Sequence, residues 1–150
     1  MNKISEIEVS YRPAIGRKPI IRSALDAYVE LKEFFPKQTI ALQEQFVCMY
    51  LNRQSRVLGV FHLSKGSISG TVVDIRLLLS VALKVAASSI IIAHNHPSGN
   101  TSPSNQDREL TKNIQAACKF LDIDVHDHII LSPFDDYYSM ASEGILSSSS

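Results

Sequence analysis

Two histidines separated by one residue and followed by an aspartate form the segment best suited to chemistry. Residues 94–107 read HNHPSGNTSPSNQD, which places His94, His96 and Asp107 within one short stretch. Side chains at positions i and i+2 of a strand project from the same face, so both imidazoles can meet one metal ion. A carboxylate from the following element can supply a third ligand. Three protein ligands leave the fourth position of zinc open to water, which is typical of catalytic sites.

Three other interpretations of this segment compete with a metal site. In the first, residues 97–99 form a turn and Ser104 with Asp107 only caps a helix; each feature is common, but their combination at fixed spacing is rare. In the second, the letters His-Asn-His mark a nuclease, but the nucleases named for those letters spread them over a ββα unit. In the third, a nucleobase deaminase would need the sequences H-x-E and P-C-x-x-C, and no cysteine lies nearby. Metal binding is the interpretation that these comparisons favour.

Composition restricts the class of protein. The 150 residues suit one domain, and 15 basic residues balance 15 acidic ones. Nucleic-acid-binding domains usually carry a basic excess, so the neutral charge counts against that class. Cys48 and Cys118 lie in apolar surroundings, and we expect buried thiols in a reducing compartment. The first residues lack the apolar region of a secretory signal, and the apolar segment 77–93 is interrupted by lysine and serines. We therefore expect a cytoplasmic protein without a membrane span.

The first half of the chain predicts an irregular arm, a helix and a hairpin. Residues 1–20 mix proline and glycine with basic residues, and we expect a basic N-terminal arm without regular structure. Apolar residues at helical spacing predict a helix over 23–35 with an apolar stripe of Leu25, Tyr28, Val29 and Leu31. Two segments rich in β-forming residues, 46–51 and 56–63, are separated by Asn-Arg-Gln-Ser, which is typical of a hairpin.

The second half is predicted to alternate between helices and strands. The segments are, in order, a turn or short strand over 66–71, a helix over 75–87, a strand over 90–94, a helix from 104 to about 120, strands over 125–131 and 137–141, and a disordered tail over 147–150. Asp74 caps the first of these helices. Ser104 and Asp107 have the spacing of a capping box at the second, where a carboxylate also favours the helix dipole. This order predicts a single-domain α/β fold with a mixed sheet flanked by helices.

The histidines outside the motif are expected to play supporting roles. His128 lies within an apolar strand, which favours a packed, hydrogen-bonded residue near the site over a metal ligand. His126 lies two residues earlier and, by strand alternation, is expected to share the face of His128.

The motif and its flanks resemble a known family of metalloproteins. The pattern H-x-H-P, six residues, S, two residues, D over 94–107 resembles the JAMM motif of MPN-domain proteins. The sequence IIAHNHPSG over 91–99 closely matches the RadC branch of that family, and DHII over 127–130 resembles its closing segment. The resemblance covers about residues 40–142. The chain departs from RadC relatives at DIRL over 74–77, where they tend to have His-Pro-Arg-Glu, and at Asn-Thr in the motif loop, where they often have Asp-Pro.

The resemblance implies a fold and a domain organisation. The fold would be the JAMM/MPN architecture, which is similar to that of cytidine deaminases, and residues 21–146 would form the domain. The residues before it do not resemble the helix-hairpin-helix region of full-length RadC proteins. The chain is therefore similar to a stand-alone RadC-like domain.

The resemblance also implies a catalytic glutamate upstream of the ligands. The best match is Glu44, because EQFVCMYL over 44–51 resembles the first core strand of the family, with the glutamate at its start. The rivals are Glu30 and Glu33, which fall away from the apolar stripe of the predicted helix, and Glu109, which helical geometry rotates away from Asp107.

The activity implied is that of a zinc hydrolase acting on an amide or isopeptide bond. His94, His96 and Asp107 would hold one Zn²⁺, Glu44 would transfer protons, and Ser104 would stabilise the oxyanion. The partner would be a peptide or protein substrate. Two alternatives stay open. One is a DNA-repair or recombination accessory with a non-catalytic metal site, supported by the basic residues Arg12, Arg17, Lys18 and Arg22. The other is a metal-dependent nuclease.

Overall fold

Two apolar runs of the sequence become the central strands of a sheet. In the computed structural model, which describes residues 3–16, 18–65 and 73–146, these runs are β1 (Gln45–Leu51) and β3 (Ser89–Asn95). Every residue of both strands is buried, which explains why they lack the polar–apolar alternation of a strand with one wet face. The strands pair antiparallel.

The strands follow the order β2-β1-β3-β4-β5 and form one mixed sheet. β2 (Val57–Lys65) forms an antiparallel hairpin with β1, and β5 (Tyr137–Ser139) pairs antiparallel with β4 (Asp124–Leu131). β3 and β4 are parallel, and α3 (Asn105–Lys119) connects them as a crossover helix. The motif segment therefore forms the loop between the carboxyl end of β3 and the start of α3.

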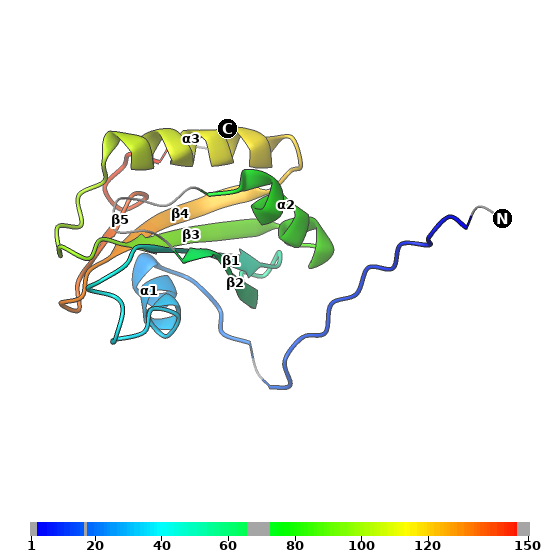
Figure 1. Ribbon diagram of the computed structural model, residues 1–150, viewed down its shortest axis with the longest axis horizontal. Helices are drawn as coiled ribbons and strands as arrows, with labels where there is room; N and C mark the ends of the chain where they lie inside the picture. Colours follow the sequence, from blue (N-terminus) through cyan, green and yellow to red (C-terminus); the bar gives the residue numbers. More distant parts are fainter. Residues whose placement is uncertain (1–2, 17, 66–72, 147–150) are drawn as a thin grey trace.

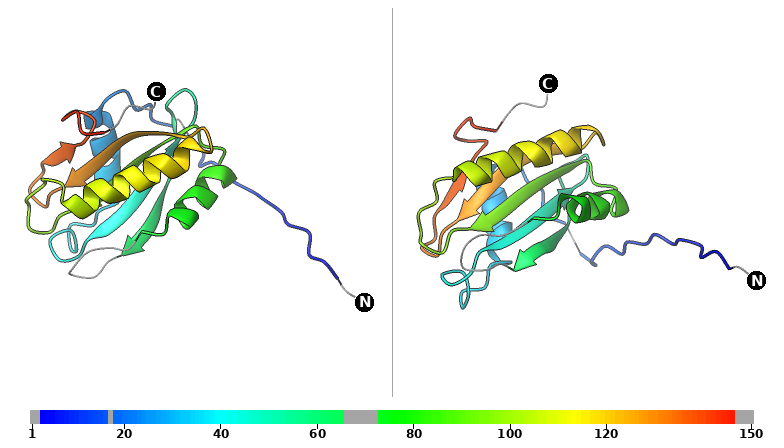
Figure 2. Two further views of the ribbon diagram at one scale, coloured as in Figure 1. Left: turned by 90° about the horizontal axis from the view of Figure 1, so that it is seen from above. Right: turned by 45° about the horizontal axis from the view of Figure 1, so that its top comes forward.

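Helices cover both faces of the sheet (Figure 1). α1 (Ala24–Lys32) packs in an apolar cluster with one face, and α2 (Ile75–Lys84) and α3 pack in a second cluster with the other. Figure 2 shows α2 and α3 side by side on their shared face. The strand that carries the first histidine is thus enclosed between two apolar cores.

The predicted order of helices and strands is confirmed, as is the mixed α/β class. The ends of the elements differ slightly: α1 ends at Lys32, α2 at Lys84 and β5 at Ser139. Ser104 is the N-cap of α3 and forms the predicted capping box, so helical residues begin at Asn105. The predictions for 66–71 and 147–150 fall outside the described residues.

The face of α1 that packs on the sheet differs from the predicted stripe. Leu25 and Val29 are 56% and 53% exposed. Tyr28 and Leu31 of the predicted stripe are buried, together with Ala27, which lies one turn before Leu31. The small side chain of Ala27 contributes to the packed face, which a prediction based on large apolar residues overlooks.

A β-bulge in β4 changes the position of His126. Ile90 pairs with Val125 and Ile91 with Asp127, so His126 is the extra residue of the bulge. His126 is exposed and lines a pocket beside α1, whereas His128 is buried against α3. The prediction that these two histidines share a face is therefore wrong.

The N-terminal segment 3–16 contains no helix or strand and projects from the rest of the structure (Figure 1). The hydroxyl of Tyr11 donates a hydrogen bond to the carbonyl of Leu58, and Ile20 forms an isolated bridge with Arg56. Within the described ranges, no helix combines the length and apolar character needed to span a bilayer.

Candidate metal centre

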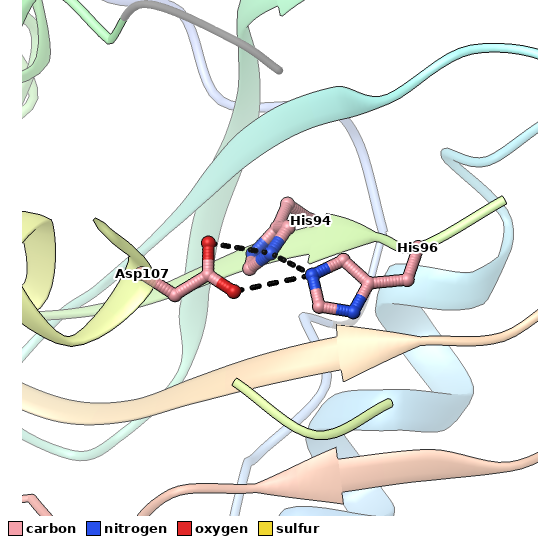
Figure 3. A group of neighbouring side chains, drawn as sticks. All are labelled: His94, His96 and Asp107. Atoms are coloured by element: carbon pink, nitrogen blue, oxygen red, sulfur yellow. Dashed lines mark hydrogen bonds and ion pairs between the residues drawn. The ribbon is translucent and has the colours of Figure 1, made fainter. Parts of the chain in front are cut away.

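The side chains of His94, His96 and Asp107 converge on one point between the end of β3 and the start of α3 (Figure 3). Nε2 of His94 lies 3.3 Å from Oδ1 of Asp107, and Nε2 of His96 lies 3.1 Å from Oδ2. The two Nε2 atoms are 2.9 Å apart. The fold thus brings together the three residues predicted as ligands, which come from a strand, a loop and a helix.

Backbone contacts hold the loop that carries His96. Its N–H donates to the carbonyl of Leu131 at 2.9 Å, which continues the pairing of β3 with β4. The N–H of Gly99 donates a hydrogen bond to the carbonyl of His96 at 3.0 Å. Gly99 has a φ of +89°, in the left-handed region that favours glycine. A Cβ at position 99 would lie 2.5 Å from the ring of Phe134. The turn therefore depends on glycine for both its conformation and its packing.

The capping box of α3 orients Asp107. Oγ of Ser104 accepts the N–H of Asp107 at 3.0 Å, and Oδ2 of Asp107 accepts the N–H of Ser104 at 2.8 Å. The same Oδ2 faces His96, while Oδ1 faces His94. The positive end of the helix dipole also favours a carboxylate in this first turn.

Hydrogen-bond directions indicate a site built for a cation. Nδ1 of His96 lies 2.7 Å from the carbonyl oxygen of Asn100, which can only accept, so Nδ1 carries a proton. In the neutral imidazole, Nε2 then has a lone pair directed at the carboxylate of Asp107. Lone pairs that face one another at such distances repel unless a proton or metal ion lies between them. Two imidazole nitrogens and a carboxylate oxygen are ligands that zinc accepts, so the residues fit the predicted metal.

The electrostatics of the centre agree with an anionic aspartate. Burial opposes ionisation of Asp107, but its interactions with the imidazoles of His94 and His96 outweigh burial and hold the pKa of Asp107 well below the usual range. The hydrogen bond to Asp107 raises the pKa of His96 against the effect of burial. Burial, followed by the charge of His94, lowers the pKa of His128. Asp107 is therefore the anionic group of the cluster and His128 a neutral neighbour.

Glu44 lies directly before β1 and lines an open cleft together with His96. Its charge contributes, after the Asp107 hydrogen bond, to the raised pKa of His96. Among the rival glutamates, Glu30 and Glu33 belong to α1 and its C-cap on the other face of the sheet. Glu109 is exposed, with an ion-pair distance of 3.8 Å to a lysine one turn along α3. Of these four glutamates, Glu44 is the one that lines a cleft with His96 and whose charge acts on the imidazole of His96.

Asn95, between the two histidines, holds the segment that carries Glu44. Its fully buried side chain accepts the N–H of Gln45 at 2.7 Å and donates to the carbonyls of Ile40 and Gln43, both at 2.8 Å. The alternation of β3 directs this side chain away from the face of His94. His94 and His96 therefore face the candidate metal centre, and Asn95 between them holds the segment that carries Glu44.

Replacing Asn95 with alanine should leave those three backbone groups without their partner. We expect the free energy of unfolding to fall by about 1–3 kcal/mol, because the buried N–H of Gln45 then goes unsatisfied. The affinity for added zinc should change little, because the side chains of His94, His96 and Asp107 stay in place. Denaturant unfolding and zinc titration measure the two effects. A large loss of zinc affinity would show that Asn95 instead supports the positions of His94 and His96.

Ser104 is exposed at the N-cap of α3. The bond from the N–H of Asp107 uses a lone pair of its oxygen and leaves the hydroxyl proton for another acceptor. Ser104 therefore has a structural role in the helix cap. Its hydroxyl lies beside Asp107, the residue that it orients.

Sequence reasoning missed two buried polar residues of this centre, Asn95 and Thr111. Oγ1 of Thr111 lies 2.6 Å from Nδ1 of His128, and Nε2 of His128 lies 2.7 Å from Nδ1 of His94. Thr111 follows Asp107 by four residues and so shares its helix face, a spacing that could have revealed it. His128 is packed and hydrogen-bonded, as its apolar strand predicted.

Comparison with known proteins relates most of the chain to one family. The sequence profile of the RadC-like JAB domain matches residues 21–145. Similar relatives are a UPF0758 protein from Porphyromonas gingivalis, 35% identical over 143 residues, and one from Flavobacterium johnsoniae, 42% identical over 102 residues. UPF0758 protein YfjY from Escherichia coli K12 is 40% identical over 104 residues. In the same order, these matches cover 95%, 68% and 69% of this chain. They cover 63%, 44% and 64% of the relatives, so the chain spans less than two thirds of the length of each relative.

Proposed function

Because this chain belongs to the family of RadC-like JAB domains and its predicted ligands converge on one point, we propose that it is a zinc-dependent hydrolase. The observation that carries the proposal is the meeting of two histidine Nε2 atoms with one carboxylate, beside a cleft lined by Glu44. By analogy with the JAMM proteins that the motif resembles, the bond cleaved is an amide or isopeptide in a peptide or protein.

Each residue of the centre has a role in this scheme. His94, His96 and Asp107 would hold the zinc and leave a fourth position for water. A bound zinc would supply Lewis acidity, which would polarise a carbonyl and lower the pKa of bound water to about 7. Glu44 would accept a proton from the attacking water and deliver it to the leaving amine. The hydroxyl of Ser104 would donate to the carbonyl oxygen as negative charge develops there.

Metal analysis and a substrate panel test the proposal. Purified protein should contain about one zinc per chain, and a chelator should remove both the metal and the hydrolysis of peptide or isopeptide substrates. Added zinc should restore both. Cleavage of nucleic acid without cleavage of any peptide-like bond would replace the proposal with a metal-dependent nuclease. Folded protein that contains no metal and takes up none on titration would contradict it.

A DNA-repair accessory role is the second candidate, and one surface feature favours it. Lys18, Arg22 and Arg56 line an open pocket where the N-terminal arm meets the edge of the sheet. In this alternative the metal would be non-catalytic. Binding of a DNA duplex that weakens steeply with salt and is lost in Arg22→Ala would support it. The absence of binding at low salt would reject it.

A further inference from the structure

A chain of hydrogen bonds between buried side chains lies behind His94, at the ring edge away from Asp107. Nδ1 of His94 is 2.7 Å from Nε2 of His128, and Nδ1 of His128 is 2.6 Å from Oγ1 of Thr111. Oγ1 of Thr111 is in turn 2.7 Å from the carbonyl oxygen of Asp107. His128 and Thr111 are only 0% and 3% exposed, so water is a poor substitute for either bond. The chain begins at one predicted ligand and ends at the backbone of another.

The direction of the last bond follows from its chemistry. A carbonyl oxygen can only accept, so Thr111 donates its single hydroxyl proton to Asp107. Sδ of Met140, at 3.7 Å, is a second acceptor for that proton. A proton directed to either atom is unavailable to His128. Thr111 therefore accepts from His128, and the proton of that bond resides on Nδ1 of the imidazole.

The tautomers of both imidazoles are then determined. A neutral histidine with its proton on Nδ1 has a lone pair on Nε2, so Nε2 of His128 accepts from Nδ1–H of His94. His94 consequently has its own lone pair on Nε2, the atom that faces Asp107 and His96. The reverse order of protons would place a hydrogen on the nitrogen that has to bind the metal.

We propose that His128 and Thr111 are positioning residues that hold His94 in the tautomer and orientation needed to bind zinc. This inference rests on the proposed metal site. A metal-binding histidine commonly donates its second N–H to a carboxylate, a backbone carbonyl or water. Here the acceptor is a second buried imidazole, whose own tautomer depends on a threonine. The hydroxyl of Thr111, two hydrogen bonds away from His94, therefore controls the zinc affinity of the centre.

Thr111→Val tests this inference because valine keeps the branched shape and removes the hydroxyl. Without an acceptor at Nδ1, His128 no longer favours one tautomer, and we expect the zinc affinity to fall by about 10- to 100-fold. Competition with a chromophoric chelator measures the affinity. Thr111→Ser keeps the hydroxyl and should bind zinc as the wild type does. Ile114→Val, also on the buried face of α3, controls for lost packing.

A second experiment determines the tautomers of His94 and His128 directly and needs no bound metal. Imidazole nitrogen NMR of chelator-treated wild-type protein should show the proton on Nδ1 of both His94 and His128, and Thr111→Val should lose that pattern. His128→Gln can place an amide oxygen near the position of Nε2. It should therefore keep more zinc affinity than His128→Leu, which offers no acceptor.

The outcomes separate this inference from the proposed function. Wild-type protein that binds no zinc would overturn both. Wild-type zinc binding that Thr111→Val leaves unchanged would overturn the positioning role alone. Equal losses of zinc affinity in Thr111→Val and Ile114→Val would also overturn it, because packing would then account for the effect.

Discussion

Glutamine in place of Glu44 should lower kcat for amide or isopeptide cleavage by about 10²- to 10⁴-fold and leave the zinc content unchanged. Glutamine has nearly the same size, but its amide cannot take a proton from water or deliver it to a leaving amine. Glu44 lines the cleft beside His96 and lies outside the cluster of His94, His96 and Asp107. Its loss should therefore reduce the rate of reaction rather than the binding of metal. Steady-state kinetics and metal analysis on the same preparation measure both quantities.

Glu33→Gln is the matched control for this experiment. Glu33 is an exposed glutamate at the C-cap of α1, the helix that covers the other face of the sheet. The same chemical change there should alter neither kcat nor zinc content. Turnover retained by Glu44→Gln would remove Glu44 from the mechanism. Loss of zinc from that variant would instead make Glu44 a ligand.

The convergence of His94, His96 and Asp107 and the helix cap at Ser104 could be predicted from the sequence because both depend on short-range spacing. His94 and His96 are neighbours on one face at a strand end, and Ser104 with Asp107 forms a capping box within one helical turn. The two central strands could also be predicted, because a run of apolar β-forming residues is typical of a strand buried on both sides. Local pattern and tertiary structure agree at each of these places.

The supporting residues could not be predicted because their roles depend on contacts between distant parts of the chain. In the sequence, Asn95 is only the residue between two histidines. In the structure, its side chain donates a hydrogen bond to the carbonyl of Ile40, 55 residues earlier. Thr111 acquires its role only when α3 packs against β4 and meets His128. The bulge at His126 arises from the pairing of β3 with β4 and breaks the alternation that a strand pattern assumes.

His96→Ala should abolish most of the stabilisation that zinc gives to the folded protein. At a zinc concentration about 100 times the Kd, binding adds about 2.7 kcal/mol to the free energy of unfolding. For a domain of this size that is a rise in Tm of about 5–10 °C. Alanine removes one of three ligands, while the backbone bond from residue 96 to Leu131 can still hold the loop. Thermal unfolding with and without zinc measures the difference.

His126→Ala is the matched control, because it removes an exposed imidazole that lies on the bulge of β4 and faces a pocket beside α1. It should keep the full zinc-induced rise in Tm. Weak zinc binding by scattered surface histidines would affect both variants alike, so the difference between them reports on the centre itself. An equal rise in Tm for His96→Ala and the wild type would place the zinc elsewhere and remove the premise of a metal-dependent hydrolase. A rise lost only in His96→Ala would tie the metal to the point where His94, His96 and Asp107 meet.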